Sequence, residues 1–287
     1  MIQTHHLTID VEEYFHPTAL EGWIPRSEWD LLPRRSGVLI PRILEILHGR
    51  GVRGTFFTLG WLAKREPETV RAIAGAGHEI ASHGWGHQRV NTLGAEAFRD
   101  DLRRSRETLE DLTGEPVVGY RAPSFSIVPG TEWALDVLLE EGFLYDSSMF
   151  PIKVHPGYGY PSVEPDPHIL HRDGGRLVEI PPATLRVGSL LLPAAGGAYL
   201  RFFPVALLKR AMGSARRRGA PATLYVHPWE MDVEMPRFRA PLLTQLRMRG
   251  GIRSVRRKIA SILTGSAFRP MRETALELLG EESGGGG

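Results

Sequence analysis

The chain is organised around the stretch Ser82-His83-Gly84-Trp85-Gly86-His87, which follows the apolar segment His78-Glu79-Ile80-Ala81. That segment has the character of the end of a β-strand. Two histidines four residues apart lie on one side of the chain if the turn is helical, so both imidazoles can reach a single metal ion. The two glycines allow a tight turn and leave room beside the metal. Taken alone, the motif also fits a polar loop whose histidines bind nothing. The choice between this and a metal-binding loop depends on the rest of the chain.

The first strand is expected within Leu7-Thr8-Ile9-Asp10-Val11-Glu12-Glu13-Tyr14-Phe15-His16. Its alternating pattern places Asp10 and Glu12 on the same face. Two carboxylates that project together repel each other, and a metal ion held by one of them relieves the repulsion and leaves the other as a base. The alternative is a solvent-facing acidic edge. The apolar start of the strand favours the functional interpretation.

Apolar strands and amphipathic helices alternate along the rest of the chain. The expected strands are 54–60, 79–82, 117–120, 143–146, 177–180 and 222–226, and the expected helices are 36–48, 67–76, 95–112, 131–141 and 205–218. This alternation indicates an α/β fold of parallel βα units, closed into a barrel or arranged as an open sheet. Glu12, His83, Arg121 and His227 stand where strands finish. A βα barrel carries its active site at the C-terminal strand ends, which explains how these residues would meet.

Other segments are less regular. Residues 151–167 are rich in Pro, Gly and Tyr and are expected to form a substrate-side loop, because the alternation resumes after them. Residues 190–203 fit either a strand pair or a hydrophobic rim. We expect a catalytic barrel over residues 1–235, a basic helical C-terminal extension over 236–280 packed on or beside it, and a flexible Gly-rich tail over 281–287.

Composition limits the class of protein. The 287 residues, 42% of them hydrophobic, can bury a substantial core. With no cysteine, disulfides and thiolate ligands are excluded, so any metal must use His, Asp or Glu. The net charge is only +2, and aromatic residues are not interleaved with the basic runs, so we expect no nucleic-acid partner.

The N-terminus lacks the pattern of a signal peptide, and no segment fits a membrane span. A soluble, cytoplasmic protein is therefore expected. Peripheral contact with the inner membrane through the basic C-terminal segment is an alternative that the sequence leaves open.

Four stretches in order carry a family resemblance. They are Thr8-Ile9-Asp10-Val11-Glu12, Ser82-His83-Gly84-Trp85-Gly86-His87, Arg121-Ala122-Pro123-Ser124-Phe125 and Leu224-Tyr225-Val226-His227. The chain resembles the polysaccharide deacetylase (NodB-homology) family over roughly residues 5 to 230. The segments 54–57 and 145–148 add to the likeness. The sequence of residues 10–15, together with the C-terminal extension, most resembles the branch of this family found with bacterial exopolysaccharide and exosortase systems.

The resemblance implies a distorted (β/α) barrel and metal-assisted hydrolysis of an N-acetyl group on a sugar. It assigns His83 and His87 as metal ligands, Asp10 as general base, Arg121 as the residue that holds this base, and His227 as general acid. A backbone N–H near Ser124 or Phe125 would help to bind the oxyanion, and Trp85 and Trp229 are further candidates for substrate contact, although packing beside the metal loop is the favoured interpretation of Trp85. The expected cofactor is one divalent ion, zinc first, with cobalt, nickel, manganese or iron as alternatives.

One position departs from the family pattern. A second aspartate usually follows the first, and here that position is Val11, which cannot bind a metal. The third ligand is therefore expected to be Glu12, which shares a face with Asp10, or else Glu13. The roles of Asp10 and Glu12 could also be exchanged. Asp232 is considered as a partner of His227, and His5, His6, His155, His168 and His171 are expected at the surface.

The leading functional hypothesis is a metal-dependent N-deacetylase acting on N-acetylhexosamine units of an exopolysaccharide or its lipid-linked precursor. A second hypothesis is another C–N amidohydrolase on the same scaffold, such as a cyclic-ureide hydrolase or a deformylase of a lipid-linked sugar. A third is a glycan-binding scaffold without activity. The presence of candidates for ligand, base and acid disfavours the third.

Overall fold

The computed structural model describes residues 4–153 and 157–280; the Gly-rich tail from residue 281 onward and His155 lie outside the described residues. Its centre is a mostly parallel sheet with the order β10-β1-β2-β3-β4-β5-β7-β6, and β11 pairs separately with the start of β1. The strands of this sheet are β1 Thr4–Val11, β2 Thr55–Thr58, β3 Glu79–Ser82, β4 Gly119–Tyr120, β5 Tyr145–Asp146, β6 His168–Arg172, β7 Gly175–Glu179, β10 Thr223–Val226 and β11 Ala267–Phe268.

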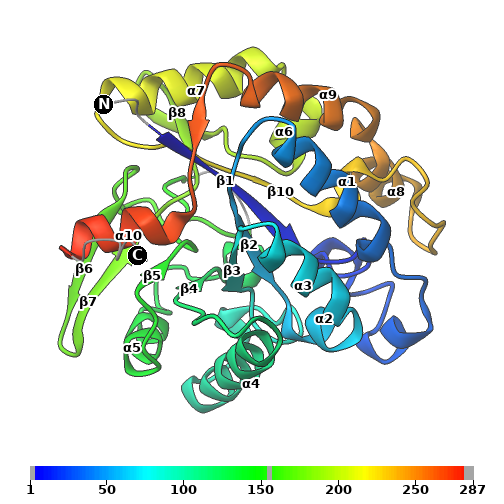
Figure 1. Ribbon diagram of the computed structural model, residues 1–287, viewed down its shortest axis with the longest axis horizontal. Coiled ribbons are helices and arrows are strands. Elements are labelled where there is room, and N and C mark those ends of the chain that lie inside the picture. The colour runs from blue at the N-terminus through cyan, green and yellow to red at the C-terminus, as the bar shows by residue number, and fades with distance from the viewer. Residues whose placement is uncertain (1–3, 154–156, 281–287) are drawn as a thin grey trace.

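Helices surround this sheet, and β1 runs through the middle of the molecule (Figure 1). They are α1 Ser36–His48, α2 Gly60–Arg65, α3 Pro67–Gly75, α4 Ala95–Thr113, α5 Trp133–Glu140, α6 Ala198–Phe202, α7 Val205–Arg217, α8 Leu242–Arg249, α9 Ile252–Leu263 and α10 Met271–Leu279. Short 3-10 turns are η1 Thr18–Leu20, η2 Arg26–Leu31, η3 Val90–Thr92, η4 Pro123–Phe125 and η5 Pro228–Met231. The central strands β1, β2 and β3 are buried on both faces, as a parallel sheet covered by helices requires.

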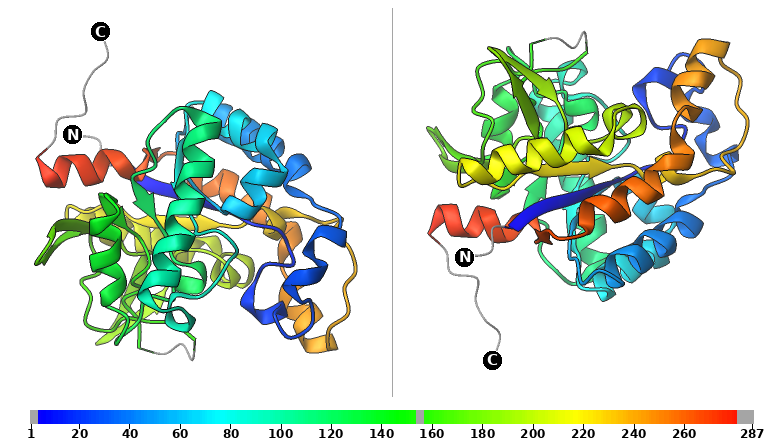
Figure 2. Two further views of the ribbon diagram at one scale, coloured as in Figure 1. Left: turned by 90° about the horizontal axis from the view of Figure 1, so that it is seen from below. Right: turned by 90° about the horizontal axis from the view of Figure 1, so that it is seen from above.

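Helical periodicity explains which helix faces pack inward. In α1 the buried residues Leu39, Ile43 and Leu47 recur every four positions. In α9 the buried residues Ile252, Val255, Ile259 and Ile262 recur every three or four, while the arginines between them face solvent. α9 thereby closes one side of the core, and residues 236–280 contribute a strand and three helices to the same body (Figures 1 and 2).

The sheet is a distorted (β/α) barrel whose regular pairing does not close among the described residues. Residues 180–183, which follow β7, lie in space between β5 and β10 as irregular backbone. The Ile180 N–H donates to the Asp146 carbonyl at 2.9 Å, and the Ala183 N–H donates to the Thr223 carbonyl at 2.9 Å. This segment bridges the two strands in the place of a regular one.

The structure adds elements that the sequence did not predict. β6 pairs antiparallel with β7 at the sheet edge, and β8 (Thr184–Val187) pairs with β9 (Leu190–Pro193) in a separate hairpin. The segment 190–203 is half of this hairpin followed by α6. The prediction that His5 and His6 lie at the surface was wrong, because β11 and α10 cover the start of β1. His6 is fully buried, with Nδ1 3.0 Å from Thr223 Oγ1 and Nε2 2.8 Å from Thr274 Oγ1.

Candidate active site

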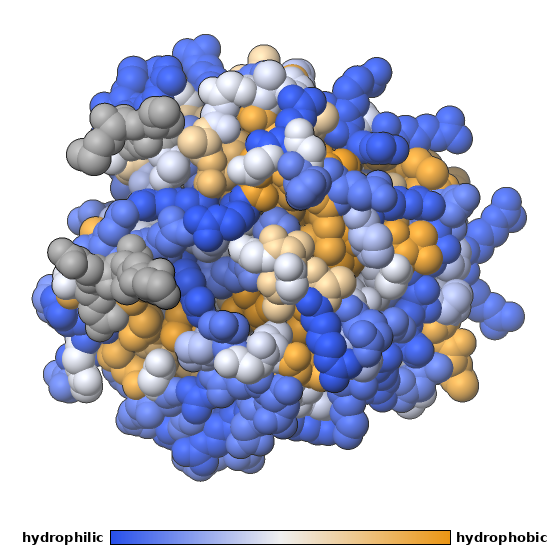
Figure 3. Space-filling model, in the orientation of Figure 1, coloured by the Kyte–Doolittle hydropathy of each residue, from blue (hydrophilic) through white to orange (hydrophobic). Residues whose placement is uncertain are grey.

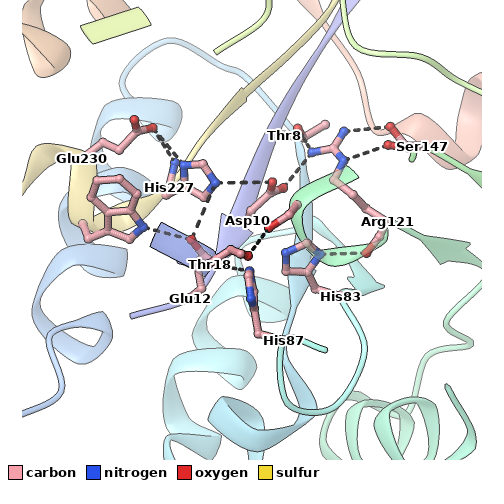
Figure 4. Close-up of polar contacts among 12 residues, drawn as sticks. Thr8, Asp10, Glu12, Thr18, His83, His87, Arg121, Ser147, His227 and Glu230 are labelled. Atoms are coloured by element: carbon pink, nitrogen blue, oxygen red, sulfur yellow. Dashed lines mark hydrogen bonds and ion pairs between the residues drawn. The ribbon is translucent and has the colours of Figure 1, made fainter. Parts of the chain in front are cut away.

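A cleft of roughly 540 Å³ opens where β1, β3, β4 and β10 end. Parallel strands bring their C-terminal ends to one edge, so residues far apart in sequence meet there. The lining includes Asp10, Glu12, His83, His87 and His227, whose side chains converge in Figure 4. Four of these five side chains are almost completely buried, and His227 is slightly exposed.

Asp10 is held by a fully buried arginine. Arg121 Nη1 donates to Asp10 Oδ1 at 2.7 Å and to Thr8 Oγ1 at 2.7 Å. Its other nitrogens donate to the Ser147 carbonyl at 3.2 Å and to Ser147 Oγ at 2.8 Å, and the guanidinium stacks over the Phe57 ring at 4.1 Å. These contacts fix the plane of the guanidinium, which in turn orients the carboxylate, as seen in Figure 4.

Glu12, His83 and His87 form the candidate metal site. Each offers one ligand atom, and these atoms lie within 4.8 Å of one another. His87 Nε2 is 2.8 Å from Glu12 Oε2. His83 Nδ1 lies 2.8 Å from the Arg121 carbonyl oxygen, to which a protonated Nδ1 donates, and this leaves Nε2 as the ligand atom.

The electrostatics of these residues suit a cation. Burial lowers the pKa of His83 to about 4, so its imidazole is neutral and able to coordinate. Burial alone would raise the pKa of Glu12, but the neighbouring imidazoles of His87 and His227 hold it below its usual range, so the carboxylate is ionised. A buried, ionised carboxylate with two histidine nitrogens is the donor set of catalytic zinc sites, which keep further positions open.

The loop that carries both histidines is not helical. Gly84 and His87 have positive φ values, 74° and 53°. Main-chain bonds from the start of α2 hold the loop, since the Gly60 and Trp61 N–H groups donate to the Gly84 and Trp85 carbonyls. The histidines converge through this left-handed geometry, which Gly84 adopts without strain.

His227 lies on the opposite side of the carboxylates from His87. Its Nε2 is 3.8 Å from Asp10 Oδ2 and 3.7 Å from Glu12 Oε1, and its Nδ1 is 3.1 Å from Glu230 Oε2. Burial lowers the pKa of His227, but the three carboxylates outweigh it and raise the value to about 9. Arg201 on α6 in turn pairs with Glu230 at 2.8 Å.

Asp232, considered above as a partner of His227, does not take that role. Asp232 instead accepts two hydrogen bonds from Arg35, at 2.8 and 3.0 Å. Glu230 is closer to His227 because η5 begins directly after the histidine and brings the residue three positions later back to it. The pattern His-Pro-Trp-Glu resembles a capping box, and this local signal could have identified Glu230 as the partner of His227.

The structure also separates the two candidates for the third ligand. Glu13 accepts the main-chain N–H groups of Arg35 and Ser36 at the start of α1, with distances of 2.8 to 2.9 Å. It therefore faces a helix N-terminus, whereas Glu12 faces the histidines. Val11 is buried in the core.

Of the four residues expected to contact substrate, three line the cleft and Trp85 does not. Ser124, Phe125 and Trp229 line the cleft, and Trp229 Nε1 donates to Glu12 Oε1 at 3.0 Å. The Phe125 N–H donates to the Ala122 carbonyl, which leaves the Ser124 N–H as the oxyanion candidate. Trp85 is outside the cleft lining, and Arg104 stacks over its ring at 3.6 Å, so Trp85 packs against α4.

Several cleft residues were not anticipated. Thr18 contacts Ser124, with their hydroxyl oxygens 2.6 Å apart, and joins η1 to η4 across the cleft. From the second half of the chain, α6 contributes Tyr199 and Arg201, and α8 contributes Arg247 and Met248. No periodicity or motif in those helices points to the cleft, so only the fold reveals them.

Two family models match the chain. One is "Polysaccharide deacetylase", over residues 29–136, and the other is "Domain of unknown function (DUF3473)", over residues 147–276. Together they span both halves of the barrel, and the cleft takes residues from each.

Similar proteins carry related names. A peptidoglycan deacetylase of Helicobacter pylori is 33% identical over 119 residues, which are 42% of this chain and 40% of that protein. A peptidoglycan-N-acetylglucosamine deacetylase of Bacillus cereus is 31% identical over 97 residues, 33% of this chain and 35% of that protein. The matches thus span less than half of these relatives' lengths. A Mycobacterium smegmatis crystal structure assigned as a polysaccharide deacetylase superposes with a TM-score of 0.65 and 25% identity, covering 96% of this chain and 91% of that one.

Proposed function

We propose that the chain, which matches the polysaccharide deacetylase model over residues 29–136, is a metal-dependent hydrolase that removes N-acetyl groups from N-acetylhexosamine units of a glycan. The observation that carries this proposal is the meeting of Asp10, the Glu12–His83–His87 cluster and His227 in one cleft. Amide hydrolysis needs a proton acceptor for water, a stabiliser of the developing oxyanion and a proton donor for the leaving amine.

A divalent cation held by Glu12, His83 and His87 would supply Lewis acidity to this site, and zinc is the proposed ion. Asp10 removes the proton of the attacking water as the oxygen bonds to the acetyl carbon. Arg121 orients the Asp10 carboxylate through their 2.7 Å contact. The Ser124 N–H stabilises the oxyanion.

His227 then protonates the nitrogen as the C–N bond breaks, which gives acetate and a free amine. Glu230 positions it by accepting the Nδ1–H. Glu230 is itself held by Arg201, and both residues lie with His227 in the segment 147–276 matched by the DUF3473 model.

We further propose an exopolysaccharide, or its lipid-linked precursor, as the substrate, supported by the match to the DUF3473 model beside the deacetylase model. We also propose that the catalytic barrel ends at residue 235 and that residues 236–280 form a C-terminal extension of it. No helix among residues 4–153 and 157–280 is long and apolar enough to cross a bilayer.

Acetate release from N-acetylated chito-oligosaccharides and from exopolysaccharide fragments tests the proposal. The expected result is acetate from wild-type protein with added zinc and none from Asp10→Asn. Allantoin and an N-formylated sugar serve as alternative amide substrates. Turnover of one of these without acetate release would replace deacetylation by the other amidohydrolase reaction.

A further inference from the structure

We propose that α8 and the loop before it dock on an anionic lipid bilayer and set the mouth of the cleft against the membrane surface. Three leucines of α8 are exposed to solvent. Leu242, Leu243 and Leu246 are 73%, 78% and 59% exposed and lie together on one side of the helix. We call them the α8 ridge. Exposed leucines clustered in this way mark an interaction surface, whereas single ones do not.

The same end of the molecule carries further apolar side chains. Trp23, which follows η1, is 50% exposed, and Leu31 in η2 is 82% exposed. Both views of Figure 2 place this segment and α8 side by side at the end towards which β1 points. Arg35, four residues after η2, forms ion pairs with Asp232 and Glu234, which precede the loop into α8. Figure 3 shows orange surface among blue side chains along the margin where Figure 1 draws α8.

Positive charge surrounds the α8 ridge. From Met235 to Arg272 the sequence has no aspartate or glutamate. Arg237 and Arg239 lie exposed in the loop that leads into α8, and Arg247 lies on α8 itself. Within the described part of the chain, no carboxylate lies at ion-pair distance from any of these three (salt bridges of the other arginines are numerous). Leucines with neighbouring unpaired arginines match a bilayer with anionic headgroups, where apolar side chains insert and cations contact phosphate.

The charge and the size of the surface disfavour other occupants. A second copy of the chain would place like-charged arginines against each other, and one eight-residue helix offers little of the area that a stable dimer buries. An acidic glycan would pair with the arginines but leave the leucines in water.

Docking through α8 has a consequence for the cleft. Arg247 and Met248 of the same helix line the cleft, so the helix that contacts lipid also borders the catalytic opening. A bilayer-bound molecule would present its cleft to glycan held at the membrane by a lipid. This consequence rests on the proposed function; the docking itself does not.

Co-sedimentation with vesicles tests the proposal. The probe is vesicles of phosphatidylcholine alone or with one third phosphatidylglycerol, mixed with purified wild-type chain. We expect binding to the anionic vesicles that is weakened by added salt. Leu242→Ser/Leu243→Ser and Arg237→Gln/Arg239→Gln are each expected to weaken the binding roughly tenfold or more.

The matched control is Val187→Ser/Leu190→Ser on the β8–β9 hairpin, where the side chains are 53% and 51% exposed. It should bind vesicles like wild type. Acetate release from a soluble oligosaccharide should be unchanged in all three variants. Failure of membrane docking and failure of the proposed deacetylase activity can therefore be told apart.

Three outcomes would overturn docking. They are no binding of wild-type chain to anionic vesicles, equal binding of the leucine variant, and leucine-dependent self-association by light scattering without vesicle binding. The second would indicate adsorption by charge alone, and the third a second copy as the occupant.

Discussion

Replacing Arg121 by methionine is expected to destabilise the fold and to disable Asp10, while leaving the metal ligands in place. The guanidinium is fully buried and donates to Asp10, Thr8 and Ser147. Without it, the Asp10 carboxylate, only 2% exposed, loses its 2.7 Å cation and keeps only His227 at 3.8 Å. Removing one partner of a buried pair costs about 3–5 kcal/mol.

The expected effects are separable in three assays. A loss of that size corresponds to a fall in Tm of roughly 5–8 °C for a chain of this length, by differential scanning fluorimetry. If Asp10 is the base, kcat for acetate release falls by about 10²- to 10⁴-fold. Metal content should stay close to wild type, because His83 is oriented by the main-chain carbonyl of residue 121, which the substitution keeps.

The double variant Asp10→Asn/Arg121→Met provides the control. It removes the buried charge as well as its partner, so it should be more stable than Arg121→Met alone even though both lack activity. Wild-type kcat and Tm in Arg121→Met, or strictly additive destabilisation in the double variant, would refute the claim that Arg121 serves the Asp10 carboxylate.

Three further predictions concern neighbouring residues. Asp10→Asn is expected to keep bound metal, by elemental analysis, and to lose acetate release. Glu230→Gln is expected to lower kcat by about 10- to 100-fold with metal retained. Asp232→Asn weakens a buried contact with Arg35, so it should lower stability by about 1.5–3 kcal/mol and keep kcat. The reverse pattern would restore Asp232 as the partner of His227. Burial raises the pKa of Asp101 to about 6 against 3.8 ordinarily, so the stability associated with its protonated form is present below pH 4 and is lost as pH rises through 6. In urea unfolding, wild-type protein should lose about 3 kcal/mol of stability over this pH range and Asp101→Asn should not; identical pH profiles would contradict this.

The residues at strand ends were the most predictable part of the site. Alternation in β1 put Asp10 and Glu12 together, and the parallel order of strands brought His83, Arg121 and His227 to the same edge. These inferences depend on periodicity and on the geometry of parallel sheets, both of which are local properties of the sequence.

Contacts between distant segments were not predictable. His6 is buried because Thr223 and Thr274 flank it, and neither lies near it in sequence. Arg201 reaches the site through Glu230, and α8 reaches it only because the chain returns along the barrel. In the histidine loop the spacing indicated convergence, but the left-handed backbone that produces it depends on bonds from α2.

Bound metal in the purified chain tests the central claim most directly. The comparison is wild type, His83→Ala and, as control, His171→Ala, an exposed histidine on β6. About one ion per chain is predicted in wild type and His171→Ala, and loss in His83→Ala, by elemental analysis after reconstitution with zinc or cobalt. Absence of metal from all three reconstituted proteins, or equal metal in all three, would contradict the assignment of Glu12, His83 and His87 as the metal site.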